Sequence, residues 1–165
     1  MTETRRLLIV QHAPSDLLAS LAAAVEEGAR DPELAAAAAE AGHDLEVRAL
    51  SPLEATSEDL LAADGVICGT SANFGYISGA LKHFFDVTFR ECHEATRGLP
   101  FAYWIRGGHD VTGAVTAMES ITGGYGWSQV AAPVTFVGPA DEARLESVRE
   151  LGGTVAAHAA GMMGR

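Results

Sequence analysis

The chain has 165 residues, and 22 carboxylate side chains against 11 basic ones give it a net charge of -11. This length fits one domain, which we expect to span residues 1–165, and the acidic balance argues against nucleic acid as a partner. No apolar run is long enough to cross a membrane and no basic segment precedes one at the start, so we expect a cytoplasmic protein without a membrane partner.

The first part of the chain predicts a strand, two helices and a second strand. Residues 7–10 form a short apolar run that is typical of a strand buried in a parallel sheet. Apolar residues then recur at helical spacing up to Pro32, which predicts one helix before this proline and another over residues 33–41. Residues 45–50 alternate between apolar and charged side chains, as an edge strand does, and residues 51–63 form a connection with helical character.

The rest of the chain repeats the order of strand, loop and helix. Residues 65–69 form another buried strand, and the loop over residues 70–77 leads to Ser78, which can cap a helix. Apolar side chains follow in that helix at spacings of three and four, which predicts one buried face. The later predicted elements are a strand over 100–105, a helix over 112–122 stopped by the glycines of 123–126, a strand over 130–137 and a helix over 141–158.

Five predicted strands alternate with helices, so the fold class is α/β, with a parallel sheet that carries helices on both faces. In such sheets a ligand binds beyond the carboxyl ends of the strands, where the strand order reverses. The loops after the first, third and fourth strands are therefore where a ligand site is expected.

The loop after the third strand suits a flat ring with polar edges. Its small residues let a ligand approach the backbone, its hydroxyl and amide groups offer hydrogen bonds, and its aromatic residues offer flat surfaces. A glycine-rich turn without a ligand remains the alternative. The candidate cofactor-binding residues here are Thr70, Ser71, Ala72, Asn73, Phe74 and Gly75.

Residues 69–86 carry the pattern Gly-Thr-x-x-x-Phe-Gly-x-x-Ser-Gly-x-Leu-Lys-x-Phe-x-Asp. This pattern resembles the flavin loop and following helix of flavodoxin-like NAD(P)H-dependent FMN reductases and quinone reductases. The resemblance implies a three-layer flavodoxin-like sandwich with a five-stranded parallel sheet in the order 2-1-3-4-5. It also implies that the loop lines the isoalloxazine ring of FMN, and that Ser78 and Gly79 let the helix pack under the loop.

Flavin sites in the resembled family often lie near a subunit interface, so we expect a homodimer or a tetramer. Aromatic side chains are candidates for the interface or the pocket, although core packing is the default for Trp104. These candidates are Phe74, Tyr76, Trp104, Tyr125 and Trp127.

The loop after the fourth strand supplies the candidate catalytic residues. The resemblance implies that Arg106, Gly107 and Gly108 meet the other edge of the flavin, where Arg106 can stabilise negative charge on the reduced ring. His109 and Asp110 can orient a quinone or a nicotinamide. The alternatives are a solvated arginine and two side chains that only form hydrogen bonds within the loop.

The loop after the first strand departs from the resembled family, which wraps the FMN phosphate with small hydroxyl residues and a glycine. Here Ala13 replaces a hydroxyl residue, Asp16 replaces the glycine and Pro14 lacks an N–H donor. His12, Pro14 and Ser15 remain as cofactor-binding candidates. We therefore expect phosphate binding that is weaker or differently built.

The leading hypothesis is an FMN-dependent oxidoreductase that takes hydride from NAD(P)H and passes electrons to a quinone, a flavin or a similar small molecule. A flavodoxin-type electron carrier and a flavodoxin-like domain that has lost its cofactor are the alternatives. No metal site is expected, because the adjacent residues 91–94 cannot converge on one ion from a regular element.

Overall fold

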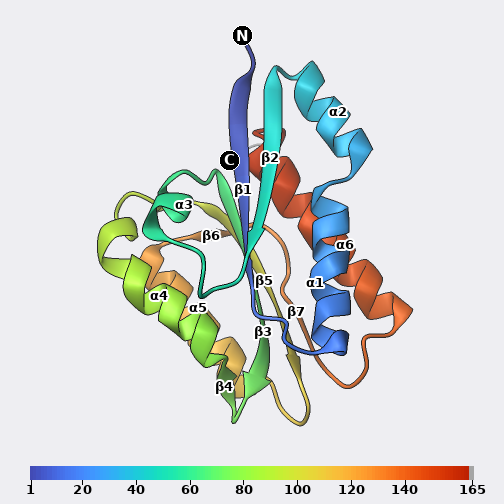
Figure 1. Ribbon diagram of the computed structural model, residues 1–165, viewed down its shortest axis with the longest axis vertical. Coiled ribbons are helices and arrows are strands. Elements are labelled where there is room, and N and C mark those ends of the chain that lie inside the picture. The colour runs from blue at the N-terminus through green and yellow to red at the C-terminus, as the bar shows by residue number, and fades with distance from the viewer. Residues whose placement is uncertain (164–165) are drawn as a thin grey trace.

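The computed structural model describes residues 1–163, which form a twisted sheet between two layers of helices (Figure 1). The predicted three-layer α/β arrangement is thereby confirmed. One face of the sheet is covered by α1 (Asp16–Ala29), α2 (Pro32–Glu40) and α6 (Glu142–Ala159), and the other by α3 (Ser57–Leu61), α4 (Gly79–Cys92) and α5 (Thr112–Tyr125).

Within residues 1–163 the sheet has seven strands, in the order β2-β1-β3-β5-β6, with β4 beside β3 and β7 beside β5. Every pairing is parallel except that of β4 with β3. The expected order of the first four predicted strands is confirmed, whereas the expected five-stranded sheet is wrong in strand number. The strands are β1 (Glu3–Gln11), β2 (His43–Leu50), β3 (Gly65–Asn73), β4 (Tyr76–Ile77), β5 (Pro100–Gly107), β6 (Ser128–Gln129) and β7 (Val134–Val137).

Two local features explain the additional strands. The predicted strand over 130–137 is interrupted, because residues 130–133 leave the sheet at Pro133, which has no N–H for a strand partner. The predicted loop over 70–77 is instead a tight hairpin, in which Phe74 and Gly75 have φ values of 51° and 74°. Positive φ at both turn residues lets β4 fold back directly onto β3.

The helix α5 runs further than expected, through Gly123 and Gly124 to Tyr125, and ends at Gly126 with a φ of 70°. Each glycine inside a helix costs roughly 1 kcal/mol relative to alanine. The extra turn is retained because it places the Tyr125 side chain in the core, where it is fully buried. No helix within residues 1–163 combines the length and the apolar composition that crossing a membrane requires.

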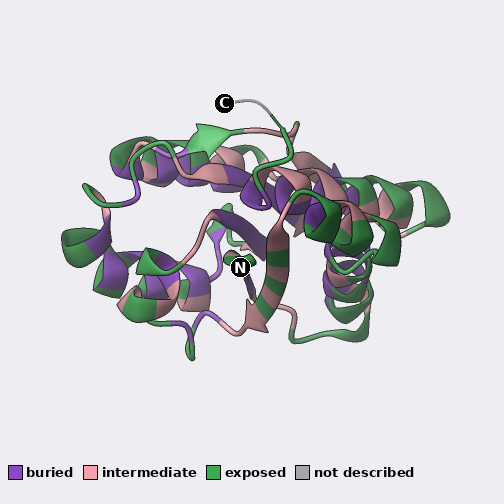
Figure 2. Ribbon diagram, turned by 90° about the horizontal axis from the view of Figure 1, so that it is seen from above, coloured by how far each residue is buried: buried purple, intermediate pink, exposed green. Residues whose placement is uncertain are grey.

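Side chains of successive strand residues point to opposite faces of the sheet, so Tyr103 packs beneath α4 and α5 whereas Trp104 packs beneath α1 and α6. Figure 2 shows the buried residues in the sheet and on the sides of the helices that face it. Trp104 is fully buried, as the default of core packing expected. Tyr125 is fully buried and Trp127 is 8% exposed, which corrects the expectation that these two lie at an interface or a pocket.

Candidate functional site

The candidate site lies at the carboxyl ends of β1, β3 and β5, at the lower edge of the sheet in Figure 1. Gln11, the last residue of β1, pairs with Gly69 of β3, while β3 continues to Asn73 and pairs with β5 through Ala72 and Gly107. The three loops predicted to hold a ligand therefore emerge side by side. We call residues 12–15, which join β1 to α1, the strap.

The strap begins and ends with hydrogen bonds to the fold. The His12 amide donates to the Gly69 carbonyl at 2.9 Å, so the start of the strap is held against β3. At its other end Ser15 caps α1, because its Oγ accepts the Leu18 amide at 3.3 Å. Pro14 and Ser15 are exposed between these two points.

The β3–β4 hairpin presents an aromatic side chain at its tip. Phe74 is fully exposed and occupies the left-handed region that favours glycine, a conformation that stores strain in a bulky residue. Asn73 is exposed beside it, and its Oδ1 accepts the Ser71 hydroxyl at 2.9 Å. A strained, exposed aromatic residue at the ligand-binding edge of the sheet is a feature of a site rather than of a core.

Thr70 supports the hairpin from inside. Its side chain is fully buried, donates to the Ser71 carbonyl at 2.8 Å and accepts the Ser78 amide at 3.1 Å. Ser78 in turn caps α4 by accepting the Leu81 amide at 3.2 Å. The Thr70 hydroxyl is thus engaged within the fold, and its backbone is the part that can meet a ligand.

Gly113, in the first turn of α5, touches the hairpin and escaped the sequence analysis. A Cβ atom on Gly113 would lie 2.0 Å from the Gly75 carbonyl oxygen, so only glycine lets α5 and the hairpin come this close. Gly79, which the resemblance assigns to helix packing, has open space where its Cβ would lie. A glycine in the first turn of a helix, where a better helix former is expected, was the available signal.

The loop after β5 turns around two glycines. Gly107 is buried, and a Cβ there would lie 2.9 Å from Val111 Cγ1, whereas a Cβ on Gly108 would meet open space. Asp110 Oδ1 accepts the amide of Thr112 at 3.0 Å and its hydroxyl at 2.7 Å, and these bonds hold the pKa of Asp110 below its ordinary value. Its carboxylate therefore stays charged and serves the start of α5.

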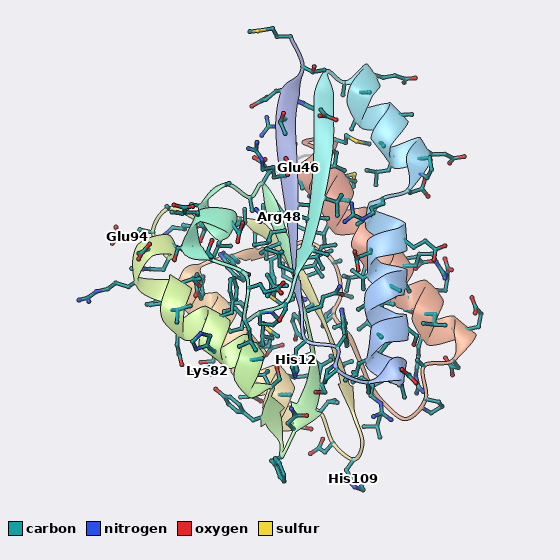
Figure 3. All side chains as sticks on the ribbon, viewed as in Figure 1. His12, Glu46, Arg48, Lys82, Glu94 and His109 are labelled. Carbon is teal, nitrogen blue, oxygen red and sulfur yellow. The ribbon has the colours of Figure 1, made fainter. Side chains whose placement is uncertain are left out.

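His109 and Arg106 lie on different parts of the edge. His109 is exposed, and Figure 3 shows it at the tip of the loop after β5. Arg106 is half-buried and pairs in register with Ser71, so both side chains point to the face covered by α1 and α6. Its Nε donates to the Gly138 carbonyl at 2.8 Å, which anchors the guanidinium beside the end of β7.

Comparison with known proteins shows the family to which the chain belongs. Residues 44–139, more than half of the chain, match the family described as NADPH-dependent FMN reductase. The chain belongs to this family. Membership supports a flavin-dependent oxidoreductase or flavodoxin-like role, with FMN as the flavin. A comparison with curated protein sequences finds no match.

Solved structures similar to this FMN reductase family member share its fold. A flavodoxin from the domain Archaea has 14% identity and a TM-score of 0.72, covering 93% of this chain and 98% of its own. A WrbA-like flavodoxin from Agrobacterium tumefaciens has 18% identity and a TM-score of 0.70, covering 96% and 99%. An oxidoreductase from Corynebacterium diphtheriae has 18% identity and a TM-score of 0.71, covering 97% and 99%. The fold is therefore flavodoxin-like.

The start of α1 decides whether an FMN phosphate fits this family member. The amide groups of Asp16 and Leu17 donate to no residue among those described, and they lie at the positive end of a long helix, as phosphate binding requires. Ser15 adds a hydroxyl beside them. The Asp16 carboxylate is exposed and free to turn to solvent, while Pro14 contributes no donor. The site thus fits FMN, with helix amides as its main phosphate donors.

Gln11 is the second residue that sequence reasoning missed. Its side-chain Oε1 accepts the Trp104 indole N–H at 2.9 Å, and its Nε2 donates to the Ala22 carbonyl of α1 at 3.5 Å. A polar residue at the last position of a buried strand was the only signal in the sequence. Beside it lies a cleft of about 390 Å³ between the strap, α1 and the end of β2.

Proposed function

We propose that the protein is an FMN-dependent oxidoreductase that oxidises NADH or NADPH and reduces a quinone, a flavin or a similar small acceptor. The observation that carries this proposal is the convergence of the strap, the hairpin and the loop after β5 on one edge of a sheet whose chain belongs to the FMN reductase family. Bound FMN supplies the hydride chemistry, and the protein supplies its binding, orientation and electrostatics.

Each loop has a separate task in this proposal. The amides at the start of α1, with Ser15 and His12, hold the phosphate. Phe74 presents a flat apolar surface to the ring, and the open backbone at Gly108 lets the ring approach the loop after β5. Arg106 brings positive charge to the face covered by α1 and α6, where it stabilises negative charge on the reduced ring.

None of the predicted catalytic candidates needs to act as an acid or a base. Asp110 is held in its charged form by Thr112, so it is a poor proton donor near neutral pH. His109 is exposed at a loop tip and is available to orient a nicotinamide or a quinone. Hydride transfer between a nicotinamide and a flavin places the chemistry on the two cofactors.

An electron carrier is the second candidate, and Asp110 is the observation that favours it. A carboxylate that is charged at neutral pH and lies beside the flavin destabilises the anionic reduced ring and makes it a stronger reductant, as a carrier requires. The hairpin residues 70–76 contain no carboxylate, and Arg106 acts in the opposite direction. This balance places the enzyme ahead of the carrier.

A homodimer or a tetramer remains part of the proposal. Phe74 is fully exposed and Tyr76 is 41% exposed, so the hairpin offers aromatic surface next to the ligand-binding edge. A second copy would cover this surface and the adjoining flavin. Light scattering at micromolar concentration tests this expectation, and a monomer would contradict it.

The test of function compares two glycine substitutions in the same helix. Wild-type protein is mixed with FMN, and the unbound FMN is then removed. The protein is assayed for oxidation of NADH and NADPH, with a quinone or free FMN as the acceptor. Gly113→Ala pushes the hairpin away, because its Cβ would lie 2.0 Å from the Gly75 carbonyl, whereas Gly123→Ala meets open space. We expect Gly113→Ala to lose at least about tenfold in FMN affinity and Gly123→Ala to match wild type.

Three outcomes separate the candidates. Retained FMN with nucleotide oxidation supports the enzyme. Retained FMN without oxidation of either nucleotide overturns the enzyme and favours the carrier. Failure of wild-type protein to retain FMN contradicts both, and leaves a flavodoxin-like domain that has lost its cofactor.

A further inference from the structure

A fully buried indole lies under the start of the strap. The Trp104 ring crosses β3 at Gly69, where a Cβ atom would lie 2.2 Å from the indole Cε2 and Nε1 atoms. The indole N–H is therefore enclosed on the face covered by α1 and α6, and it needs a partner within the fold. Gln11 Oε1 provides that partner at 2.9 Å.

The same Gln11 side chain connects three parts of the molecule. Its backbone ends β1 opposite Gly69, and the next residue, His12, donates its amide to the Gly69 carbonyl at 2.9 Å. Its Oε1 binds Trp104 of β5, and its Nε2 reaches the Ala22 carbonyl of α1 at 3.5 Å. Gln11 thus fixes the point at which the strap leaves the sheet and ties this point to the helix on which the strap ends.

We infer that Gln11 is a positioning residue for the FMN phosphate, and that Trp104 holds its side chain in place. The inference rests on the proposed function, since it requires that FMN bind at the strap. Pro14 removes one donor from the strap, so the phosphate depends on the direction of the few amides at the start of α1. Groups that orient a ligand-binding residue without touching the ligand often change the affinity for that ligand.

The isoalloxazine side of the site is held by other contacts. Thr70 binds the Ser78 amide, and Gly113 packs against Gly75, so the hairpin is fixed without Gln11. Loss of the Gln11–Trp104 bond should therefore weaken binding of the phosphate and leave binding of the ring unchanged. Riboflavin, which has the same ring and ribityl chain but no phosphate, separates these two parts.

The other helix layer offers a matched control. Trp127 is also buried, and its indole N–H donates to the Thr96 Oγ1 at 3.0 Å. Thr96→Val removes the acceptor of a buried indole, as Gln11→Leu does, but on the face covered by α4 and α5. The two variants share a loss of stability and differ in their distance from the strap.

The experiment measures the dissociation constants of FMN and riboflavin for wild type, Gln11→Leu, Trp104→Phe and Thr96→Val. We expect FMN affinity to fall on the order of tenfold in Gln11→Leu and Trp104→Phe, with riboflavin affinity unchanged. Thr96→Val keeps the wild-type ratio of the two constants. Trp104→Phe keeps the test valid where Gln11→Leu fails to fold.

Equal weakening of FMN and riboflavin would overturn the inference and give Gln11 a purely structural role. An unchanged FMN affinity in both variants of the Gln11–Trp104 pair would also overturn it. A wild-type protein that does not bind FMN overturns the proposed function itself, and this result is seen before any variant is made.

Discussion

The two helix layers of the molecule are held together internally by different means. The layer of α1 and α6 relies on close backbone contact, because a Cβ on Gly28 would lie 1.9 Å from the Arg149 carbonyl oxygen and one on Gly152 would lie 2.2 Å from that of Val25. The layer of α4 and α5 relies on aromatic side chains, with the rings of Tyr125 and Trp127 centred 4.5 Å apart.

This difference matters for function because the site draws on both layers. The strap ends on α1, so its position depends on a helix contact that leaves no room for a Cβ atom at Gly28 or Gly152. The hairpin and the loop after β5 lead into α4 and α5, whose contact is made by aromatic side chains. Small changes at the contact between α1 and α6 should therefore affect the phosphate side of the site before the ring side.

The largest expected effect comes from adding one methyl group to the tight layer. Gly152→Ala forces α6 away from the Val25 carbonyl and should lower the free energy of unfolding by about 3 kcal/mol or more, as overpacking does. Urea denaturation followed by circular dichroism measures the change. Gly123→Ala in α5 is the control, since its Cβ meets open space and alanine favours a helix by roughly 0.5–1 kcal/mol. Equal loss in both variants would remove the distinction between the layers.

The buried indoles give the next largest effect and allow a direct comparison of the layers. Gln11→Leu leaves the Trp104 N–H without its acceptor, and Thr96→Val does the same to Trp127. Each should lower the free energy of unfolding by about 1–3 kcal/mol, the usual cost of a buried polar group left unpaired. Thermal unfolding of the two variants checks this. A loss in only one of them would show that the other indole finds a new partner.

Two tyrosines within the aromatic layer separate hydrogen bonding from ring packing. The Tyr125 hydroxyl donates to the Phe85 carbonyl at 2.9 Å and lies 2.8 Å from Thr88 Oγ1, whereas the Tyr103 hydroxyl is buried near the Glu119 charge and makes no direct hydrogen bond among residues 1–163. Tyr125→Phe should cost about 1 kcal/mol and Tyr103→Phe should cost nothing or stabilise the protein.

Absorbance near 295 nm in alkaline titration (roughly where phenolate absorbs) would also distinguish these tyrosines from exposed ones. Burial, aided by the Glu119 charge, raises the pKa of Tyr103 to about 12, and burial raises that of Tyr125 above its ordinary value. Ionisation of either phenol near its ordinary pKa of about 10 would contradict this packing.

The smallest expected effect is a pH dependence of local stability that is confined to the start of α5. Asp110 has a lowered pKa, so its stabilising contribution is present above the pKa of the unfolded chain and is lost as pH falls through the folded pKa. Below about pH 4, the protection of amides against hydrogen exchange should fall at the start of α5, whereas the Ser15 cap of α1 does not titrate. Asp110→Asn should abolish the pH dependence, and its persistence would assign the effect to another group.

Much of the fold follows from local patterns in the sequence. The alternation of buried runs and amphipathic segments is enough to place β1, β2, β3, β5 and the helices, because these elements depend on periodicity. The split of the last strand has a local cause, because Pro133 lies inside the apolar run and has no N–H for a strand partner. The extension of α5 to Tyr125 depends on tertiary contacts instead. Burial of one tyrosine outweighs two helix-breaking glycines, and no local pattern reports that.

The sequence predicts which loops form the candidate site, but it does not predict the contacts that their residues make. The pattern at residues 69–86 located the hairpin, yet the inward turn of the Thr70 hydroxyl depends on Ser78, and the contact of Gly113 with Gly75 joins two distant segments. Gln11 was missed for the same reason, since its role arises from Trp104 across the sheet. Residue type indicates what a side chain can bind, and only the fold shows what it has already bound.

FMN binding at the carboxyl ends of β1, β3 and β5 is tested most directly by an amide NMR titration of the wild-type protein with FMN. We expect chemical-shift changes in the strap, the start of α1, the hairpin and the loop after β5, all at the carboxyl edge of the sheet. The amides at the opposite edge, where β1 and β2 begin, should stay unchanged. An absence of shifts at saturating FMN, or shifts confined to the opposite edge, would contradict an FMN site at the carboxyl ends of β1, β3 and β5.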